Sequence, residues 1–411
     1  MMNPSTRPIA AIARLSKTRQ APRVAGMVST TDSVRDVDTG GDDASVGPLQ
    51  QLIVQGTPYC NLDCGYCYLP DRSPMSYLEI STTRRLAQII AASGLLAGQL
   101  DIRWHAGEPL TLNPGFYDEA ATEISAILGP HAQIRHSVQT NGLFLNDSWM
   151  KLFRKWDFRV GLSIDGPAHI HDRWRKTRKG NGTHAALTRR LGLFAEHGVD
   201  FDVISVVTPV TLDHAEDYLK YMAALAPRSL GINVEESEGS HTSSAIGDES
   251  FLERFRSFAD RLMVWSASTG IPVRELRSID HIMRDKPRWV RNTQNVPGAI
   301  ITVTVDGTLS TFSPELAGQQ DGRLKSLAIG NVFDKDILVK LVNCGSGEIA
   351  DSIRRGVARC RAECAYFMFC GGGAPANKFY ENGCFASTET LMCRTTVMAF
   401  ADAYETTESL E

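Results

Sequence analysis

Short apolar, β-rich runs alternate with amphipathic helical patterns between residues 49 and about 270, and this alternation constrains the fold most. It predicts parallel strands with helices packed outside them. Six strands are expected, at 52–54, 100–104, 134–138, 160–164, 203–207 and 230–234. Helical patterns occupy 83–92, 116–128, 148–155, 185–197, 215–225 and 251–268. Because a closed barrel needs eight units, a partial barrel and an open doubly wound sheet both fit.

Polar residues that are unusual in this setting follow the expected strands at their carboxyl ends. They are Cys60, Gly107, Glu108, Thr140, Asn141, Asp165, Thr208, Glu235 and Glu236. In parallel α/β folds this rim is where ligands bind. A random scatter of polar residues would not gather there. We therefore interpret residues 48–295 as a partial (β/α)6, TIM-like barrel.

The pattern changes after about residue 295. Two apolar runs at 300–305 and 309–312 flank Asp306-Gly307, which predicts a β-hairpin. A cysteine-rich region follows, and we expect a second domain at 296–395 and a helix or tail at 396–411. At the other end, residues 1–25 hold five basic residues and no acid, before a stretch rich in Ser, Thr, Gly and Asp. We expect 1–47 to be a disordered tail, with docking of an acidic peptide as the alternative.

Charge and cysteine usage narrow the class of protein. The net charge is −4, which gives no reason to expect nucleic acid or an anionic membrane as a partner. The N-terminus lacks the apolar core of a signal peptide. Six of the nine cysteines fall between Cys344 and Cys393, and in a reducing compartment such clusters bind metal more often than they pair. We expect a cytoplasmic protein with oxygen-sensitive metal centres.

Three further cysteines, Cys60, Cys64 and Cys67, form a C-x3-C-x2-C loop after the first strand. Three thiolates are one short of a structural zinc site, unless His105 supplies the fourth ligand. On a [4Fe–4S] cube they would leave one iron open. The spacing, with Tyr66 before the third cysteine, resembles that of the radical S-adenosylmethionine (radical SAM) enzymes. The resemblance implies a [4Fe–4S] cluster whose open iron binds S-adenosylmethionine and generates a 5′-deoxyadenosyl radical.

Other loops resemble the same family in the same order. The segment 106–109 resembles the glycine–glutamate–proline loop that receives the amino group of the cofactor, with Ala106 replacing the first glycine. The segment 163–167 resembles the ribose-contacting loop, and the segment around 171–175 supplies an arginine for the carboxylate. Taken singly, each loop could equally be a strand exit or a turn. The cofactor-binding residues that the resemblance implies are Tyr66, Gly107, Glu108, Asn141, Ser163, Asp165 and Arg175.

The C-terminal cysteines resemble the SPASM extension of peptide-modifying radical SAM enzymes. Its full form holds two auxiliary clusters, but here 310–314 and Ala374 lack the cysteines of the inner one. The resemblance therefore implies one auxiliary [4Fe–4S] cluster, an electron acceptor. Cys384 is the alternative to Cys393 as the fourth ligand, and zinc is the alternative metal. We interpret Cys344 as a thiol that binds no metal. The implied ligands are Cys360, Cys364, Cys370 and Cys393.

The strings at 57–72, 310–316 and 370–390 resemble the cyclophane-forming peptide maturases paired with glycine-rich-repeat precursor peptides. The resemblance covers about 49–395. It implies hydrogen abstraction from a β-carbon and attack of that carbon on an aromatic ring two residues earlier. Loss of an electron and a proton then completes a C–C crosslink. The implied partners are a glycine-rich precursor peptide with aromatic residues and an external electron donor such as flavodoxin or ferredoxin.

A base would collect the ring proton, and Glu315, just after the hairpin, is our candidate. Asp306, Glu235 and Glu236 are alternatives, and a rim carboxylate is as often a solvated charge. Anaerobic sulfatase maturases, which form formylglycine, and thioether-forming maturases are rivals within the superfamily. Missing inner-cluster cysteines count against the former. Rivals from other classes are a non-catalytic iron–sulfur sensor or electron carrier and a zinc-stabilised interaction module.

Overall fold

The structure is a computed structural model that describes residues 46–239, 241, 249–285, 290–319 and 321–408. The predicted tail at 1–47 lies outside the described residues except for its last two positions. The strands are β1 (Leu49–Val54), β2 (Leu96–Trp104), β3 (Ala132–Thr140), β4 (Arg159–Ser163), β5 (Phe201–Val207), β6 (Leu230–Val234), β7 (Ile300–Val303), β8 (Thr308–Thr311) and β9 (Ala328–Asn331).

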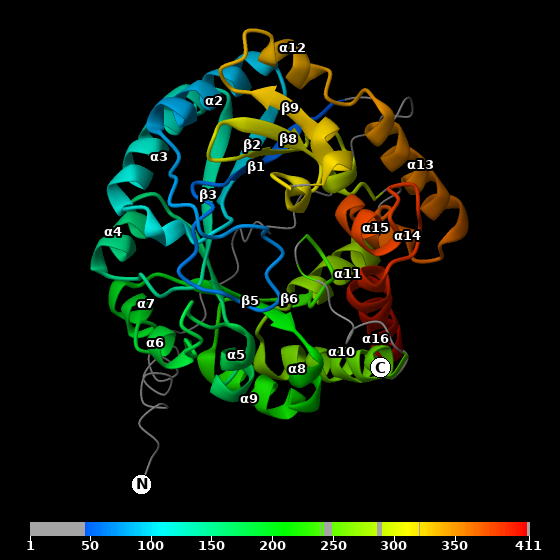
Figure 1. Ribbon diagram of the computed structural model, residues 1–411. Helices are drawn as coiled ribbons and strands as arrows, with labels where there is room; N and C mark the ends of the chain where they lie inside the picture. The colour runs from blue at the N-terminus through cyan, green and yellow to red at the C-terminus, as the bar shows by residue number, and fades with distance from the viewer. Residues whose placement is uncertain (1–45, 240, 242–248, 286–289, 320, 409–411) are drawn as a thin grey trace.

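Helices follow the strands and cover the outer face of the sheet (Figure 1). Those of the first part are α2 (Ile80–Ser93), α3 (Pro114–Leu128), α4 (Asp147–Lys155), α5 (Ala168–Trp174), α6 (His184–Thr188), α7 (Gly192–His197), α8 (Pro209–Asp213), α9 (Ala215–Leu225), α10 (Glu249–Thr269) and α11 (Arg274–Asp285). Those of the second part are α12 (Ile337–Val342), α13 (Glu348–Glu363), α14 (Phe367–Cys370), α15 (Pro375–Asn382), the π-helical η6 (Cys393–Ala399) and α16 (Phe400–Glu408).

The strand order confirms the partial barrel. In the described part of the chain one sheet runs β6-β5-β4-β3-β2-β1-β7-β8-β9, and β1 to β6 are parallel neighbours in chain order. A doubly wound sheet would instead reverse direction after its first strands. Successive right-handed crossovers in one direction put every helix on the same face of the sheet, and Figure 1 shows these helices as a ring around the strands.

Two of the elements expected from the sequence differ in detail from those in the structure. The hairpin is confirmed, since β7 and β8 pair antiparallel around Asp306-Gly307. It also extends the barrel sheet, because β7 pairs parallel with β1. The helix expected at 185–197 is interrupted, and a turn at 189–191 separates α6 from α7. Gly192 at the restart is a poor helix former, which is consistent with the break.

The strand alternation separates an apolar outer layer from a polar interior. In β2 the side chains of Ile102 and Trp104 are buried, whereas Asp101 and Arg103 lie on the opposite face. The Trp104 ring packs 4.8 Å from Tyr117 of α3, measured between centroids. This aromatic packing holds the helices outside. The opposite face turns charged side chains toward the inside of the barrel, where a polar substrate could be accommodated.

The cysteine-rich segment has a smaller core of its own. Phe312 and Leu316, just after β8, are buried with Phe379 of α15 and with Phe385, and the last two rings stack at 4.9 Å. The chain then returns to the barrel, where Phe400 of α16 packs against Phe255 of α10 at 5.9 Å. The described residues contain no helix with the length and apolarity needed to cross a membrane.

Candidate active site

The cysteine loop leaves the carboxyl end of β1, and its three thiols are partly buried. Their charges act on one another, and burial raises the pKa of Cys60 to about 12 and that of Cys64 to about 11. Hydrogen-bond donors reach the loop sulfurs: the backbone N–H of Leu62 lies 3.4 Å from Cys60 Sγ, and Arg72 bonds to Cys67. Three converging thiols with donors to sulfur fit a cluster held by three thiolates.

The cysteine loop is anchored to the segment that follows α5. The N–H of Gly65 donates to the carbonyl of Trp174 at 3.1 Å, and the N–H of Asp63 donates to the carbonyl of Lys176 at 2.8 Å. A Cβ at Gly65 would lie 2.9 Å from the Trp174 ring, so a larger residue does not fit without a shift. Trp174 was not among the predicted residues, since an aromatic residue at a helix end carries no signal of its own.

Glu108 connects the loops after β2 and β3. It is 2% exposed and accepts hydrogen bonds from Leu110 N at 2.9 Å, Thr140 Oγ1 at 2.5 Å and Asn141 N at 2.8 Å. Burial raises the pKa of Glu108 to about 7, although these donors act against the increase. Asn141 Nδ2 in turn donates to Asn61 Oδ1 in the cysteine loop at 2.8 Å. The predicted residues Glu108 and Asn141 are thus brought together beside the cysteines.

The backbone before Glu108 is left-handed at two successive residues. Gly107 has φ +57°, and a Cβ there would lie 2.4 Å from the carbonyl oxygen of Thr57 and 2.5 Å from that of Tyr59. Ala106 has φ +72°, a conformation that favours glycine. The alanine that departs from the family pattern is therefore accommodated in a strained conformation.

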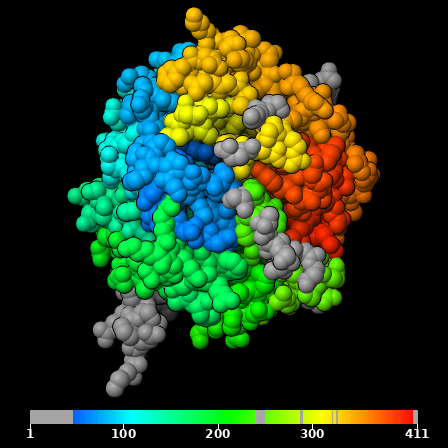
Figure 2. Space-filling model, in the orientation of Figure 1, coloured from blue at the N-terminus to red at the C-terminus, as the bar shows by residue number. Residues whose placement is uncertain are grey.

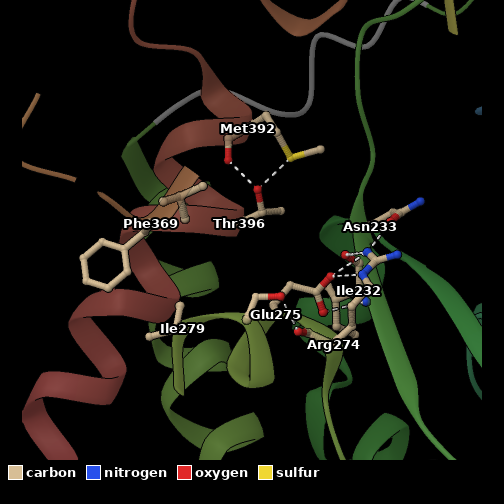
Figure 3. Close-up of a pocket in the computed structure, with 10 residues that line it drawn as sticks. Ile232, Asn233, Arg274, Glu275, Ile279, Phe369, Met392 and Thr396 are labelled. Atoms are coloured by element: carbon tan, nitrogen blue, oxygen red, sulfur yellow. Dashed lines mark hydrogen bonds and ion pairs between the residues drawn. The ribbon is translucent and has the colours of Figure 1, made fainter. Parts of the chain in front are cut away.

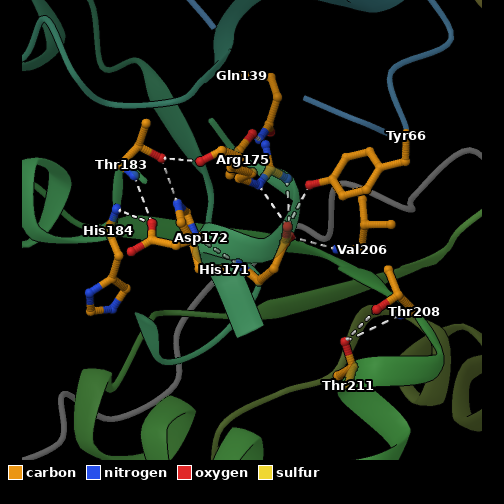
Figure 4. Close-up of polar contacts among 12 residues, drawn as sticks. Tyr66, Gln139, His171, Asp172, Arg175, Thr183, His184, Val206, Thr208 and Thr211 are labelled. Carbon is orange, nitrogen blue, oxygen red and sulfur yellow. Dashed lines mark hydrogen bonds and ion pairs between the residues drawn. The ribbon is translucent and has the colours of Figure 1, made fainter. Parts of the chain in front are cut away.

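Asp165 and Arg175 form a buried pair that also bonds to Tyr66, and Figure 4 labels the arginine and the tyrosine. Arg175 donates from Nε at 2.9 Å and from Nη2 at 3.1 Å to the two oxygens of Asp165, which also accept from Tyr66 Oη and from Val206 N. Burial alone would lower the pKa of Arg175, but Asp165, Tyr66 and Cys64 raise it overall. The guanidinium therefore stays charged, 5.4 Å from the centre of the Tyr66 ring. Cofactor contacts from these residues remain predictions.

Neighbouring side chains hold this group in place. The backbone N–H of Asp165 donates to His171 Nδ1 at 3.3 Å, while His171 Nε2 lies 3.0 Å from Thr183 Oγ1. Burial lowers the pKa of His171 to about 3, so its ring is neutral. Ser163 Oγ accepts from Gln139 Nε2 at 2.9 Å. Thr183 was not among the predicted residues, because a single threonine outside any motif carries no signal.

A group of carboxylates lies where the cysteine loop meets the hairpin. Glu315 Oε2 is shielded from solvent and has no hydrogen-bond partner among the described residues. Its charge acts on Tyr68, next to the last cysteine of the loop, and on Glu236 after β6. Burial raises the pKa of Glu315, and burial together with the Glu315 charge raises that of Glu236 to about 8. Carboxylates from two distant segments therefore converge on one place.

The alternative bases have other contacts. Asp306 is exposed and accepts hydrogen bonds from Thr304 Oγ1 at 2.6 Å and Thr308 Oγ1 at 3.0 Å, which explains its position in the turn. Glu235 Oε1 lies 3.0 Å from His241 Nε2. Glu236 accepts from Asn377 Nδ2. Glu235 Oε2, like Glu315 Oε2, is buried without a hydrogen-bond partner among the described residues, and the choice of Glu315 as the base stays a prediction.

The C-terminal cysteines gather beside α15. The charges of Cys360 and Cys393 act on Cys370, and burial raises the pKa of Cys370 to about 11. Cys364 follows Cys360 by one helical turn, with its N–H bonded to the Cys360 carbonyl at 2.9 Å. Cys384 is exposed. Cys393 thus lies close to the other predicted ligands, and its role as the last ligand stays a prediction.

Two cavities lie near these groups. One of about 460 Å³ is bordered by the segment just after the cysteine loop, the segment after β6 and α15, with Pro70, Gly239 and Tyr380 in its wall. Figure 2 shows the blue segment around the cysteine loop and the yellow and red C-terminal segments on the same face. The other, of about 240 Å³, lies between β6, α11 and η6 (Figure 3). There Arg274 Nη2 donates to Asn233 Oδ1 at 2.8 Å, so these polar groups bond to each other.

Comparison with known proteins agrees with this architecture. The family model described as "Radical SAM superfamily" matches residues 54–222. Over 379 residues, 90% of this chain and 94% of the other, the sequence is 36% identical to the Synechocystis protein "Uncharacterized protein sll1766". It is 32% identical over 194 residues to the Klebsiella aerogenes "Serine-type anaerobic sulfatase-maturating enzyme". That match spans 47% of this chain and 48% of the enzyme, about half of each.

Two solved structures share the fold. One is anSMEcpe with bound AdoMet and Cp18Cys peptide, with a TM-score of 0.68 and 19% identity, over 89% of this chain and 100% of that one. The other is Streptococcus suis SuiB bound to precursor peptide SuiA, with a TM-score of 0.56 and 14% identity, over 84% and 76%. A [4Fe–4S] cluster and S-adenosylmethionine are the cofactors of the matched family, and the donor set at residues 60–67 fits them. Residues 54–222 match the radical SAM superfamily, and the chain belongs to the same family as the Synechocystis protein.

Proposed function

We propose that the protein is a maturase of a ribosomally made precursor peptide and joins a β-carbon to an aromatic ring. The bound cluster and S-adenosylmethionine supply a 5′-deoxyadenosyl radical able to remove a hydrogen atom from an unactivated C–H bond. Closing the ring then requires a second loss, of one proton and one electron. In total the peptide loses two hydrogens and gains one C–C bond.

The observation that carries this proposal is how the chain fills the region where a full SPASM extension holds its inner cluster. Ser313 is 1% exposed, donates to Gln294 Oε1 at 2.7 Å and accepts from Ala376 N at 3.4 Å. Phe312 is buried beside it with Phe379. Packed side chains thus occupy the region between the hairpin and Ala374. One auxiliary group remains, on Cys360, Cys364, Cys370 and Cys393, and it would supply an electron acceptor.

Glu315 is the proposed proton acceptor. Its unpartnered Oε2 is sheltered from water, and the raised pKa of the carboxyl suits a base that works near neutral pH. Tyr68 of the cysteine loop stands nearby, with its Oη 3.3 Å from His105 Nε2. Burial, and next the charge of Arg103, lower the pKa of His105 to about 4. His105 is therefore neutral, and its contact with Tyr68 Oη positions the tyrosine ring.

The peptide would reach this place through the cavity of about 460 Å³. Tyr380 and the ion pair of Arg323 with Asp321 line the cavity, and the Arg323 guanidinium lies 4.5 Å from the centre of the buried Phe379 ring. Both solved neighbours were determined with a bound peptide, which supports a peptide substrate here. An external donor such as flavodoxin or ferredoxin would supply the reducing electron.

Formylglycine formation is the second candidate. It is favoured by the sequence matches to serine-type and cysteine-type sulfatase-maturating enzymes, which cover less than half of this chain. That reaction also removes two hydrogens, but from the side chain of a single serine or cysteine, and at a cysteine water then replaces the sulfur, which leaves as hydrogen sulfide. The site of hydrogen loss therefore distinguishes the two functions.

The test is anaerobic co-expression with the peptide of a neighbouring small reading frame that encodes glycine-rich repeats with aromatic residues. Tandem mass spectra should show loss of two hydrogens per site and no fragmentation across a three-residue span. Loss confined to one serine or cysteine would establish formylglycine chemistry instead. Deoxyadenosine with an unchanged peptide would reject this substrate. A variant with alanine at Cys60, Cys64 and Cys67 is the control and should give neither product.

A further inference from the structure

Lys378 is a buried lysine whose ammonium group lies against a cysteine. It is 2% exposed, although it sits on α15 near the surface of the C-terminal region. Its Nζ donates to Cys360 Sγ at 3.3 Å. Lysine is almost never fully buried unless it is paired. Among the residues that the structure describes, no carboxylate forms an ion pair with Lys378, so the sulfur is its counterpart.

The surroundings of Lys378 are shaped for a long side chain. A Cβ at Gly356 would lie 3.1 Å from Lys378 Nζ and 2.3 Å from the carbonyl oxygen of Phe385. A Cβ at Gly373 would lie 3.9 Å from Lys378 Cε. Gly356 of α13 thus leaves room for the end of the lysine, whereas a Cβ at Gly373 would make only an ordinary van der Waals contact with it.

Two of the other three predicted ligand sulfurs, those of Cys370 and Cys393, also receive a donor. The backbone N–H groups of Gly372 and Gly373 bond to Cys370. Thr390 Oγ1 lies 3.2 Å from Cys393 Sγ. A neutral thiol is a weak acceptor, whereas a charged acceptor makes hydrogen bonds about twice as strong. The donors therefore suit sulfurs that carry negative charge.

We propose that Lys378 is a positioning residue that raises the reduction potential of the auxiliary iron–sulfur cluster. The inference rests on the auxiliary cluster of the proposed function. Four thiolates give a [4Fe–4S] cluster a net negative charge, and reduction by one electron adds to it. A positive charge at a ligand sulfur, shielded from water, opposes that increase. Lys378 thus makes the cluster a better acceptor for the electron released during ring closure.

The test compares Lys378→Met with Lys378→Arg in the full-length, anaerobically reconstituted protein. Iron is counted, and the midpoint potential of each cluster is measured by redox titration monitored by electron paramagnetic resonance. Added S-adenosylmethionine changes the signal of the open-iron cluster and so identifies it. We expect Lys378→Met to shift the auxiliary potential to a more negative value and Lys378→Arg to retain it. Lys340→Met removes an exposed lysine and should leave both potentials unchanged.

Thr390→Val keeps the inference testable if Lys378→Met does not retain its cluster. It removes one donor to Cys393 and should shift the auxiliary potential in the same direction by a smaller amount. Equal potentials in wild type and Lys378→Met with full iron content would overturn the inference. So would an unchanged Thr390→Val potential where Lys378→Met has lost its cluster, or zinc in place of iron. The potentials are measured without peptide, so a failed crosslinking assay bears only on the proposed function.

Discussion

Arg175 and Asp165 form a bidentate ion pair, with Nε and Nη2 of the arginine 2.9 and 3.1 Å from the two carboxylate oxygens. The side chains are 9% and 1% exposed. The sequence predicted a separate cofactor contact for each residue. In the structure they form one ion pair, and Asp165 also accepts a hydrogen bond from Tyr66 Oη. The charges of both residues act on Cys64, the second cysteine of the loop. Any cofactor contact they make therefore depends on the pair.

Arg175→Met should destabilise the protein by about 3–5 kcal/mol, because it leaves the Asp165 carboxylate buried without its partner. The double variant Asp165→Asn/Arg175→Met should recover part of that loss. Both should weaken binding of S-adenosylmethionine. Chemical denaturation gives the free energies of unfolding, and equilibrium dialysis gives the affinity. A double variant no more stable than Arg175→Met would show that the two side chains do not act as a pair.

Ala106→Gly should stabilise the protein by roughly 0.5–1 kcal/mol, because glycine adopts the observed φ of +72° without a Cβ clash. Gly107→Ala is its matched opposite. The new Cβ would meet the carbonyl oxygen of Thr57 at 2.4 Å, so this variant should unfold more easily and bind S-adenosylmethionine poorly. Thermal unfolding of both variants checks the prediction. Equal effects at the two positions would contradict the backbone argument.

Glu315→Gln should lower crosslinked product about 100-fold or more, the usual loss when a general base is removed. Deoxyadenosine should still form, since hydrogen abstraction precedes the proton transfer. Asp306→Asn is the control, because Asp306 is exposed in the hairpin turn. Chromatography of the deoxyadenosine and mass spectrometry of the peptide report the two steps separately. Full crosslinking by Glu315→Gln would show that another group is the base.

Cys393→Ser should remove the auxiliary cluster and lower the iron content by about four atoms per chain, the content of one [4Fe–4S] cube. Cys384→Ser should leave the iron content unchanged, because Cys384 is exposed. Iron and sulfide assays after anaerobic reconstitution measure the difference. The opposite pattern would make Cys384 the ligand.

Glu236→Gln should change how stability depends on pH. The pKa of Glu236 is raised from 4.5 to about 8 in the folded protein, so the folded state binds the proton more tightly than the unfolded state. Its contribution to stability is present below pH 4.5 and is lost as pH rises toward 8. Wild type should therefore lose more stability than Glu236→Gln between pH 6 and pH 8 in urea denaturation. The exposed Glu196→Gln should behave like wild type, and parallel curves for all three would refute the assignment.

Local patterns predicted much of the fold. The strand expected at 134–138 lies within β3, the strand expected at 160–164 overlaps β4 except for its last residue, and the Asp306-Gly307 turn joins β7 to β8. These elements are visible because residue periodicity and turn chemistry act over a few neighbours. The pairing of β7 with β1 is different. It joins segments about 250 residues apart, and nothing in either strand specifies the other.

In the candidate site, too, some features follow from local sequence and others from the tertiary structure. C-x3-C-x2-C is a spacing within eight residues, so the sequence alone determined that this chain carries a radical SAM loop. Tertiary structure alone decided that Glu315 and Glu236 share one place, that Arg175 binds Asp165, and that Lys378 reaches Cys360. The physical reason is that charge and burial act through space. A carboxylate or a lysine acquires its properties from neighbours that the folded chain brings to it, and these neighbours leave no mark on its own segment.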